Sequence, residues 1–163
     1  MKTRNHNHAA EDTSQVKGEG LKPQQSAGVG EIPLSQAIVA METLKPYVTH
    51  GQMQTLWDLC RQGEEKGHFR QFVQDLAARI AAMPKTYETD GQGLKAVAHL
   101  HYFTPAFDFY ITEKDRAGGT QQAFGLACAH ERELGYINIR QLVEAGAELD
   151  LYWTPKTLAE IGR

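Results

Sequence analysis

This chain of 163 residues has only two cysteines, no long apolar run and no net positive charge. The two cysteines, Cys60 and Cys128, lie far apart, so we expect reduced thiols rather than the disulfide framework of small secreted proteins. No stretch approaches the roughly 18 consecutive apolar residues of a membrane span, and the first 30 residues lack the apolar segment of a secretory signal. These absences predict a soluble, cytoplasmic protein with no membrane partner.

The charge of the chain is weakly negative and unevenly distributed. A formal net charge of −3 lacks the positive field by which nonspecific nucleic-acid binders attract phosphate. Residues 1–30 sum to +1 and residues 31–85 to zero, whereas residues 86–163 carry seven basic and eleven acidic side chains, a net charge of −4. Turn signals stand at both boundaries, at Gly28–Gly30 and at Met83-Pro84. We therefore expect three parts, of which the last is acidic.

The first part, residues 1–30, is polar and has few apolar side chains. Their burial could not offset an ordering cost of roughly 1 to 2 kcal/mol per residue, so this part is predicted to be a disordered arm. His6 and His8 supply too few ligands for a specific metal site.

The second part, residues 31–85, is predicted to be a subdomain of three helices. Apolar residues recur at helical spacing from Ser35, a plausible N-cap, to Pro46, which should end the first helix. Thr49 and Gln52 have the spacing of a capping box and open a second helix that runs to Gly63. The third helix carries its apolar stripe at these positions: Phe69, Phe72, Val73, Leu76 and Ile80, and Pro84 follows its end. We interpret the stripe, and Cys60, as core.

The third part, residues 86–163, alternates as strands do. Residues 96–103 and 107–112 are predicted to pair as an antiparallel hairpin across the turn at Thr104-Pro105-Ala106. Residues 124–129, 134–139 and 149–153 are predicted to be further strands, with a short helix over 139–145 and a terminal turn opening at Pro155. Helices followed by an antiparallel sheet indicate an α+β fold.

Four short blocks in this part are similar to the ordered blocks of an uncharacterised bacterial family, catalogued as a domain of unknown function. The blocks are Phe109–Glu113, Ala123–Leu126, Glu133–Ile137 and Leu149–Pro155, and the resemblance covers about residues 96–160. Family members are common on plasmids and integrative conjugative elements, so the resemblance implies a mobile-element setting but no reaction. The chain departs from the pattern at two positions. Phe109 stands where the family has an aromatic residue that is often Trp, and Leu149 stands where Arg commonly precedes the Asp that matches Asp150.

Two pairs of side chains have the spacing of metal ligands. On a strand, His99 and His101 point to one face about 6.5 to 7 Å apart, and Cys128 and His130 repeat that spacing. If their two strands were neighbours, the four side chains would form a tetrahedral zinc site. The alternative is that they are ordinary strand and loop residues that hold no metal, and this reading has the larger weight because most such histidine pairs bind nothing. We therefore expect no cofactor, with zinc as the alternative.

Carboxylates and aromatic side chains are the remaining candidates. Five carboxylates stand at predicted strand ends or turns, where they could cluster at one rim: Asp108, Glu113, Asp115, Glu133 and Asp150. The alternative is that Glu113 and Asp115 cap a turn, that Glu133 and Asp150 face Lys or Arg across the sheet, and that the rest are solvated. The strand half contains no serine, and the chain has neither a Gly-x-Ser-x-Gly elbow nor a phosphate-binding loop. A hairpin rich in aromatics resembles a stacking platform for single strands, but such platforms need a basic groove. The candidate interaction residues are Tyr102, Phe107, Tyr110, Glu113, Asp115, Glu133, Tyr136, Asp150 and Trp153.

The function expected from these observations is contact with a protein partner rather than catalysis. We expect an accessory or regulatory protein of a mobile genetic element, for example one that interferes with a host defence complex, where acidity competes with nucleic acid for a basic channel. A zinc-binding protein or metal-dependent enzyme built on His99, His101, Cys128 and His130 is the first alternative. A binder of single-stranded nucleic acid is the second.

Overall fold

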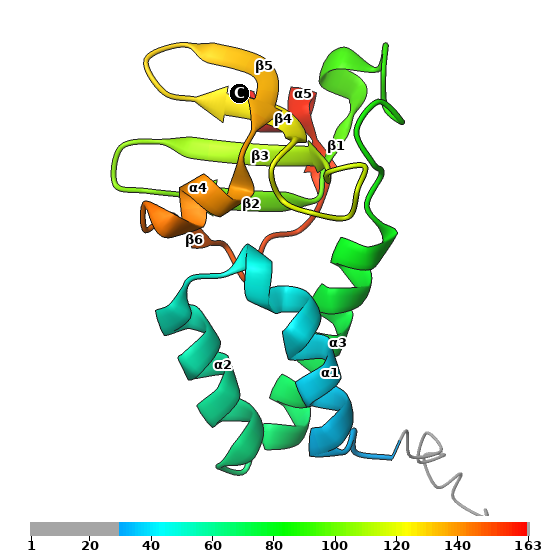
Figure 1. Cartoon of the computed structure of the whole chain (residues 1–163), viewed down its shortest axis with the longest axis vertical. Helices are drawn as coiled ribbons and strands as arrows, with labels where there is room; N and C mark the ends of the chain where they lie inside the picture. Colours follow the sequence, from blue (N-terminus) through cyan, green and yellow to red (C-terminus); the bar gives the residue numbers. More distant parts are fainter. Residues whose placement is uncertain (1–29, 163) are drawn as a thin grey trace, which may run out of the picture. The chain divides into compact units, whose positions relative to one another are not determined.

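The computed structural model describes residues 30–162 (Figure 1). The predicted disordered arm over residues 1–30, with His6 and His8, lies outside the described residues except for Gly30. From Glu31 onward the chain forms one compact unit. Among the described residues, no helix combines the length and the apolar character needed to cross a membrane.

This unit has the predicted α+β class. Its α-helices are α1 (Leu34–Leu44), α2 (His50–Arg61), α3 (Lys66–Ala82), α4 (Ile139–Glu144) and α5 (Leu158–Ile161), with 3-10 turns at Lys45–Tyr47 and Gly93–Lys95. Its strands are β1 (Val97–Ala98), β2 (Leu100–Phe103), β3 (Asp108–Glu113), β4 (Ala123–Cys128), β5 (Arg132–Ile137), β6 (Glu148–Leu149) and β7 (Lys156–Thr157).

The three predicted N-terminal helices are α1, α2 and α3. Helix α2 begins with the predicted capping box, in which Thr49 and Gln52 bond each other's backbone N–H groups. The predicted cap at Ser35 is wrong, because α1 begins one residue earlier and its N-cap is Pro33, with no side-chain hydrogen bond. Helices α1 and α3 run side by side in Figure 1, and the apolar stripe of α3 packs in the core as expected.

The strands form a five-stranded antiparallel sheet in the order β5-β4-β3-β2-β6 and a two-stranded sheet of β1 and β7. The predicted hairpin is present, with Tyr102 opposite Phe109. The continuous strand predicted over 96–103 is interrupted at His99, so that β1 and β2 join different sheets. The strand predicted over 149–153 ends at Leu149, because the Asp150 side chain accepts from the Tyr152 N–H and its carbonyl from the Trp153 N–H, which closes a turn.

One face of the five-stranded sheet is covered by the N-terminal helices; we call it the covered face. Its buried side chains are Leu100, Tyr102, Ile111, Ala123, Ile137 and Leu149, and they share one core with Leu44, Leu56, Val73 and Ile80. Helices and sheet are also joined by hydrogen bonds, from the Tyr102 hydroxyl to the Tyr47 carbonyl at 2.7 Å and from the Gln52 amide to the Leu149 carbonyl at 2.7 Å. The boundary predicted at residue 85 therefore separates two parts of one packed unit.

The opposite face, here called the second face, carries alternate side chains of the same strands. In register across β2, β3, β4 and β5 lie His101, Tyr110, Leu126 and Leu134. A small second core of Ala96, Ala98, Leu126 and Leu158 covers its middle. Helix α5 contributes Leu158 to this core, and Trp153 packs against it.

A β-bulge in β3 changes which side chains reach the second face. Between Ile111 and Glu113 the register with β4 shifts, so that Ile111 pairs with Gly125 but Glu113 pairs with Phe124. Simple alternation would place Glu113 with Ile111 on the covered face. An extra residue in one strand re-aims the side chains that follow it, so Glu113 stands in a cross-strand row with Phe124 and Tyr136.

Gly125 makes the close strand pairing beside the bulge possible. A Cβ atom at this position would lie 2.0 Å from the carbonyl oxygen of Tyr110, a distance that the backbone could not accept without moving. Its partner across β5, Gly135, has open space at the same place. The sheet therefore needs a residue without a side chain at 125 but not at 135.

Candidate functional site

The loop between α3 and β1 is tied to the bulge by the Glu113 carboxylate. Glu113 is 3% exposed and accepts hydrogen bonds from the backbone N–H of Tyr87 and of Thr89, both at 2.8 Å. The Thr89 hydroxyl also donates to it. Three donors compensate a carboxylate that has been removed from water, and they fix the position of this loop over the sheet.

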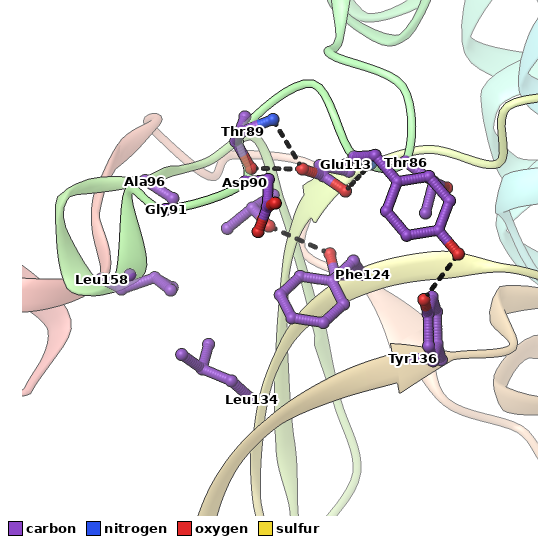
Figure 2. Close-up of a pocket in the computed structure, with 13 residues that line it drawn as sticks. Thr86, Thr89, Asp90, Gly91, Ala96, Glu113, Phe124, Leu134, Tyr136 and Leu158 are labelled. Atoms are coloured by element: carbon purple, nitrogen blue, oxygen red, sulfur yellow. Dashed lines mark hydrogen bonds between the residues drawn. The ribbon is translucent and has the colours of Figure 1, made fainter.

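A hollow of about 400 Å³ opens between this loop and the second face of the sheet (Figure 2). Figure 2 shows Glu113 at one end of the hollow and the apolar side chains of Leu134 and Leu158 at the other. The residues that line it come from the loop, from β3, β4 and β5, and from α5: Thr86, Tyr87, Thr89, Asp90, Gly91, Gly93, Ala96, Thr112, Glu113, Phe124, Leu134, Tyr136 and Leu158. We call this hollow the Glu113 pocket.

Three aromatic rings stand along the Glu113 pocket. The Tyr136 hydroxyl donates to the Tyr87 hydroxyl at 2.8 Å, and the two rings meet edge to face with centroids 6.4 Å apart. Phe124 also meets Tyr136 edge to face, with centroids 5.7 Å apart. Tyr87 adopts a φ of 78°, a left-handed conformation that aromatic residues rarely take, and the bonds to Glu113 and Tyr136 hold it there.

Two carboxylates line the pocket near its tyrosine rim, those of Glu113 and Asp90. The pKa of Tyr136 is raised, first by its hydrogen bond with Tyr87, then by burial, and further by Tyr87, Glu113 and Asp90. Negative charge disfavours ionisation of a phenol, so Glu113 and Asp90 add to a rise in the pKa of Tyr136 that comes first from its hydrogen bond with Tyr87. Tyr87 and Tyr136 are each 59% exposed, so this rim is open to a ligand.

A second polar cluster on the second face is centred on His101. Its Nε2 lies 2.7 Å from Asp108 Oδ1 and its Nδ1 lies 3.2 Å from Asp150 Oδ2. The imidazole stacks on Tyr110 with centroids 4.6 Å apart and also contacts Trp153. Both ring nitrogens are therefore engaged by carboxylates of this chain, and neither faces a free position for a substrate. The arrangement suits a structural clamp between β2, β3 and the segment after β6.

The structure does not bring the four proposed zinc ligands together. Strand β3 lies between β2, which holds His101, and β4, which holds Cys128, so the neighbouring strands on which the site depended are absent. His101 is bonded to two carboxylates, and His130 is exposed and meets the ring of Phe107 edge to face. Burial and Arg79 lower the pKa of His99. Within residues 30–162 there is no group of three or more His, Cys, Asp or Glu side chains that could hold a metal ion.

The cysteines are not activated as nucleophiles. Burial raises the pKa of Cys128, Arg132 opposes the rise, and Asp108 adds to it. Burial also raises the pKa of Cys60, which is core as predicted. A raised pKa keeps a thiol protonated near neutral pH, where the thiolate is the nucleophilic form.

The candidate interaction residues fall into several places. Tyr102 is fully buried, so its assignment to an interaction surface is wrong. Asp115 caps a turn by accepting from the N–H groups of Ala117 and Gln122, one of the roles foreseen for it. The others lie at the Glu113 pocket (Glu113, Tyr136), in or beside the His101 cluster (Tyr110, Asp150, Trp153), against His130 (Phe107) and exposed on β5 (Glu133). The acidic residues therefore do not converge at one rim.

Sequence reasoning missed the loop side of the pocket. The predicted site residues did not include Tyr87, Thr89 or Asp90, and two of the three groups that hold Glu113 are backbone N–H groups, which leave no sequence signal. An aromatic residue beside two threonines and a Gly at position 91 was the single available sign of a structured turn.

Searches with this sequence and structure find no matching family model, no matching curated protein and no matching solved structure.

Proposed function

We propose that this chain is a non-enzymatic binding protein that acts in the cytoplasm by contact with another protein, as an accessory or regulatory component of a mobile genetic element. The observation that carries the proposal is the open rim of the Glu113 pocket. Tyr87, Tyr136 and Leu134 are 59%, 59% and 43% exposed and stand together around a hollow. Large apolar and aromatic side chains gathered around a concave surface are typical of interaction sites.

Two other side chains of the second face could in principle act in acid–base or nucleophilic catalysis, but their surroundings favour a binding role for the protein. His101 has both ring nitrogens engaged by carboxylates, and burial raises the pKa of Cys128. An imidazole bonded to two carboxylates positions segments of the chain, and a thiol with a raised pKa stays protonated near neutral pH. The mobile-element setting, in which interference with a host defence complex is one role, rests only on the resemblance of the four sequence blocks described above.

The nucleic-acid alternative is disfavoured by the chemistry of the pocket. Its lining residues, all within the described part of the chain, include Glu113 and Asp90 but no lysine or arginine. Phosphate groups would meet two carboxylates there, whereas single-strand binders place aromatic rings beside basic side chains.

Site-specific photo-crosslinking in the native host tests the proposal. A photoreactive residue at Leu134 should crosslink one defined protein, and the additional change Tyr136→Ser should abolish that product. The same residue at Tyr152, which is 76% exposed and lies outside the pocket, is the matched control and should not crosslink that protein. Identical products from both positions, or none from Leu134, would contradict the proposal. Plasmid or conjugation genes beside the coding sequence are expected under the mobile-element part of it.

A further inference from the structure

The Glu113 pocket combines aromatic walls with two carboxylates that make no ion pair within residues 30–162. Two carboxylates, Glu113 and Asp90, are among its lining residues, and in the described part of the chain no lysine or arginine lines it. Within residues 30–162, Glu113 makes no ion pair; its partners are N–H groups and a hydroxyl, which are all neutral. A nearly buried carboxylate without a cationic partner attracts a ligand that carries positive charge.

The carboxylate has room for one more donor. Its Oε1 accepts two hydrogen bonds and its Oε2 accepts one. An ionised carboxylate offers about four acceptor sites on its two oxygens, so one site on Oε2 is left. Because Glu113 is fixed by three donors before any ligand arrives, a cation would bind without having to order it.

The aromatic rings present the matching surfaces. The planes of Tyr87 and Tyr136 meet at 76° and those of Phe124 and Tyr136 at 80°, so the rings form walls at nearly right angles. A cation over the face of such a ring is attracted by its quadrupole. Rings at right angles beside a carboxylate are suited to an ammonium group, whose bulk contacts several walls at once.

The far end of the pocket is apolar. Leu134 and Leu158 lie there, away from Glu113 (Figure 2). A purely ionic ligand would gain nothing from these side chains, whereas an alkyl chain attached to an ammonium group would bury against them. The pocket therefore has one end for a positive charge and one for a hydrocarbon stem.

We propose that the Glu113 pocket binds an alkylammonium group, and that this group is a lysine side chain of the partner protein. The identification of lysine rests on the proposed function, since a binding protein that acts on another protein meets this chemistry as a side chain. A free aliphatic amine has the same chemistry, so the two sources are separated by experiment.

The first experiment titrates the full chain with three small probes and follows the ring-proton signals of Phe124 and Tyr136 by NMR. The probes are Nα-acetyl-lysine methylamide, its neutral counterpart Nα-acetyl-norleucine methylamide, and n-butylammonium chloride. The lysine derivative should bind at least about tenfold more tightly than the norleucine derivative, a difference of about 1.4 kcal/mol. Equal binding of the two, or no saturable shift up to the solubility of the lysine probe, would overturn the proposal. Tighter binding of n-butylammonium than of the lysine derivative would overturn its partner-lysine part.

Matched variants locate the binding in the pocket. Asp90→Asn and Glu133→Gln each remove one negative charge, but only Asp90 lines the pocket, so only Asp90→Asn should weaken the lysine probe, by several-fold. Tyr136→Leu should weaken it about tenfold, whereas Tyr152→Leu, outside the pocket, should not. Equal effects in either pair would contradict the assignment. Glu113→Gln is informative if its circular dichroism is unchanged; Asp90→Asn and Tyr136→Leu decide the matter if it does not fold.

The two proposals can fail separately. If the lysine probe does not bind but the Leu134 crosslink persists and depends on Tyr136, the ligand assignment is wrong and the binding function stands. If the lysine probe binds in the pocket but no protein is crosslinked there, the protein-contact function is wrong, and the partner-lysine part falls with it.

Discussion

The two faces of the five-stranded sheet differ in what holds their side chains in place. On the covered face, Leu100, Ile111 and Leu149 are buried against helices and make one core. On the second face, polar and aromatic side chains are held by specific hydrogen bonds, to His101 at one place and to Glu113 at another. The comparison shows that one face of the sheet is held by apolar packing against helices, whereas the other face, on which we propose a binding site, relies on specific hydrogen bonds. Three predictions test this division.

The largest effect is expected from truncating the covered face. Ile111 is fully buried, so Ile111→Ala should lower the free energy of unfolding by about 2 to 5 kcal/mol through lost burial and the cavity left behind. Leu134, on the second face, is 43% exposed, and Leu134→Ala should cost about 1 kcal/mol or less. Urea unfolding of both variants measures the difference. Similar losses of unfolding free energy for the two variants would show that the second face contributes as much to stability as the covered face.

An intermediate effect is expected at the His101 cluster. His101→Gln removes at least one of the contacts to Asp108 and Asp150, and because water can reach both carboxylates, a destabilisation of about 0.5 to 1.5 kcal/mol is expected in urea unfolding. His130→Gln is the matched control, because His130 is exposed and should change stability by no more than about 0.5 kcal/mol. An unchanged unfolding midpoint for His101→Gln would show that the cluster does not clamp the segment after β6.

The smallest effect is a dependence of stability on pH at His99. Burial, with Arg79, lowers the pKa of His99 in the folded chain, whereas the unfolded chain has the ordinary value near about 6.5. As the pH falls below that value, the unfolded state takes up the proton more readily, so acid weakens the folded state. His99→Gln should therefore lose less stability than the natural chain between pH 8 and pH 5.5. The same loss in both chains would refute this role, and His130→Gln provides the comparison.

Much of the covered face could be predicted because local patterns specify it. The apolar stripe on α3 and the capping box of Thr49 and Gln52 can be recognised from the spacing of residues along the chain alone. The β2–β3 hairpin was equally visible, because alternation and a short turn are local signals. The same reasoning placed Tyr102 wrongly, since alternation does not tell which face of a strand the helices will cover.

Glu113 and Tyr136 were among the predicted candidates, but their grouping in one pocket could not be predicted, because it depends on long-range and backbone features. The Glu113 pocket needs a bulge that turns Glu113 away from the covered face and a loop whose N–H groups meet it. The proposed zinc site needed β2 and β4 to be neighbours, and strand order is a property of the whole sheet that the spacing of His101 and Cys128 does not contain. Residues 149–153 alternate as a strand would, yet the Asp150 side chain bonds the local backbone and turns the chain.

The side-chain amide of Gln52 has a consequence for assembly. It donates to the Leu149 carbonyl and accepts from the Leu149 N–H, as the backbone of a neighbouring strand would, and so it occupies the free side of β6. Strand β5, at the other edge of the sheet, is six residues long and is not capped in this way within the described residues. A second copy of this sheet could therefore join edge to edge only beside β5, and a pair joined through both β5 strands would have no free edge left for a third copy.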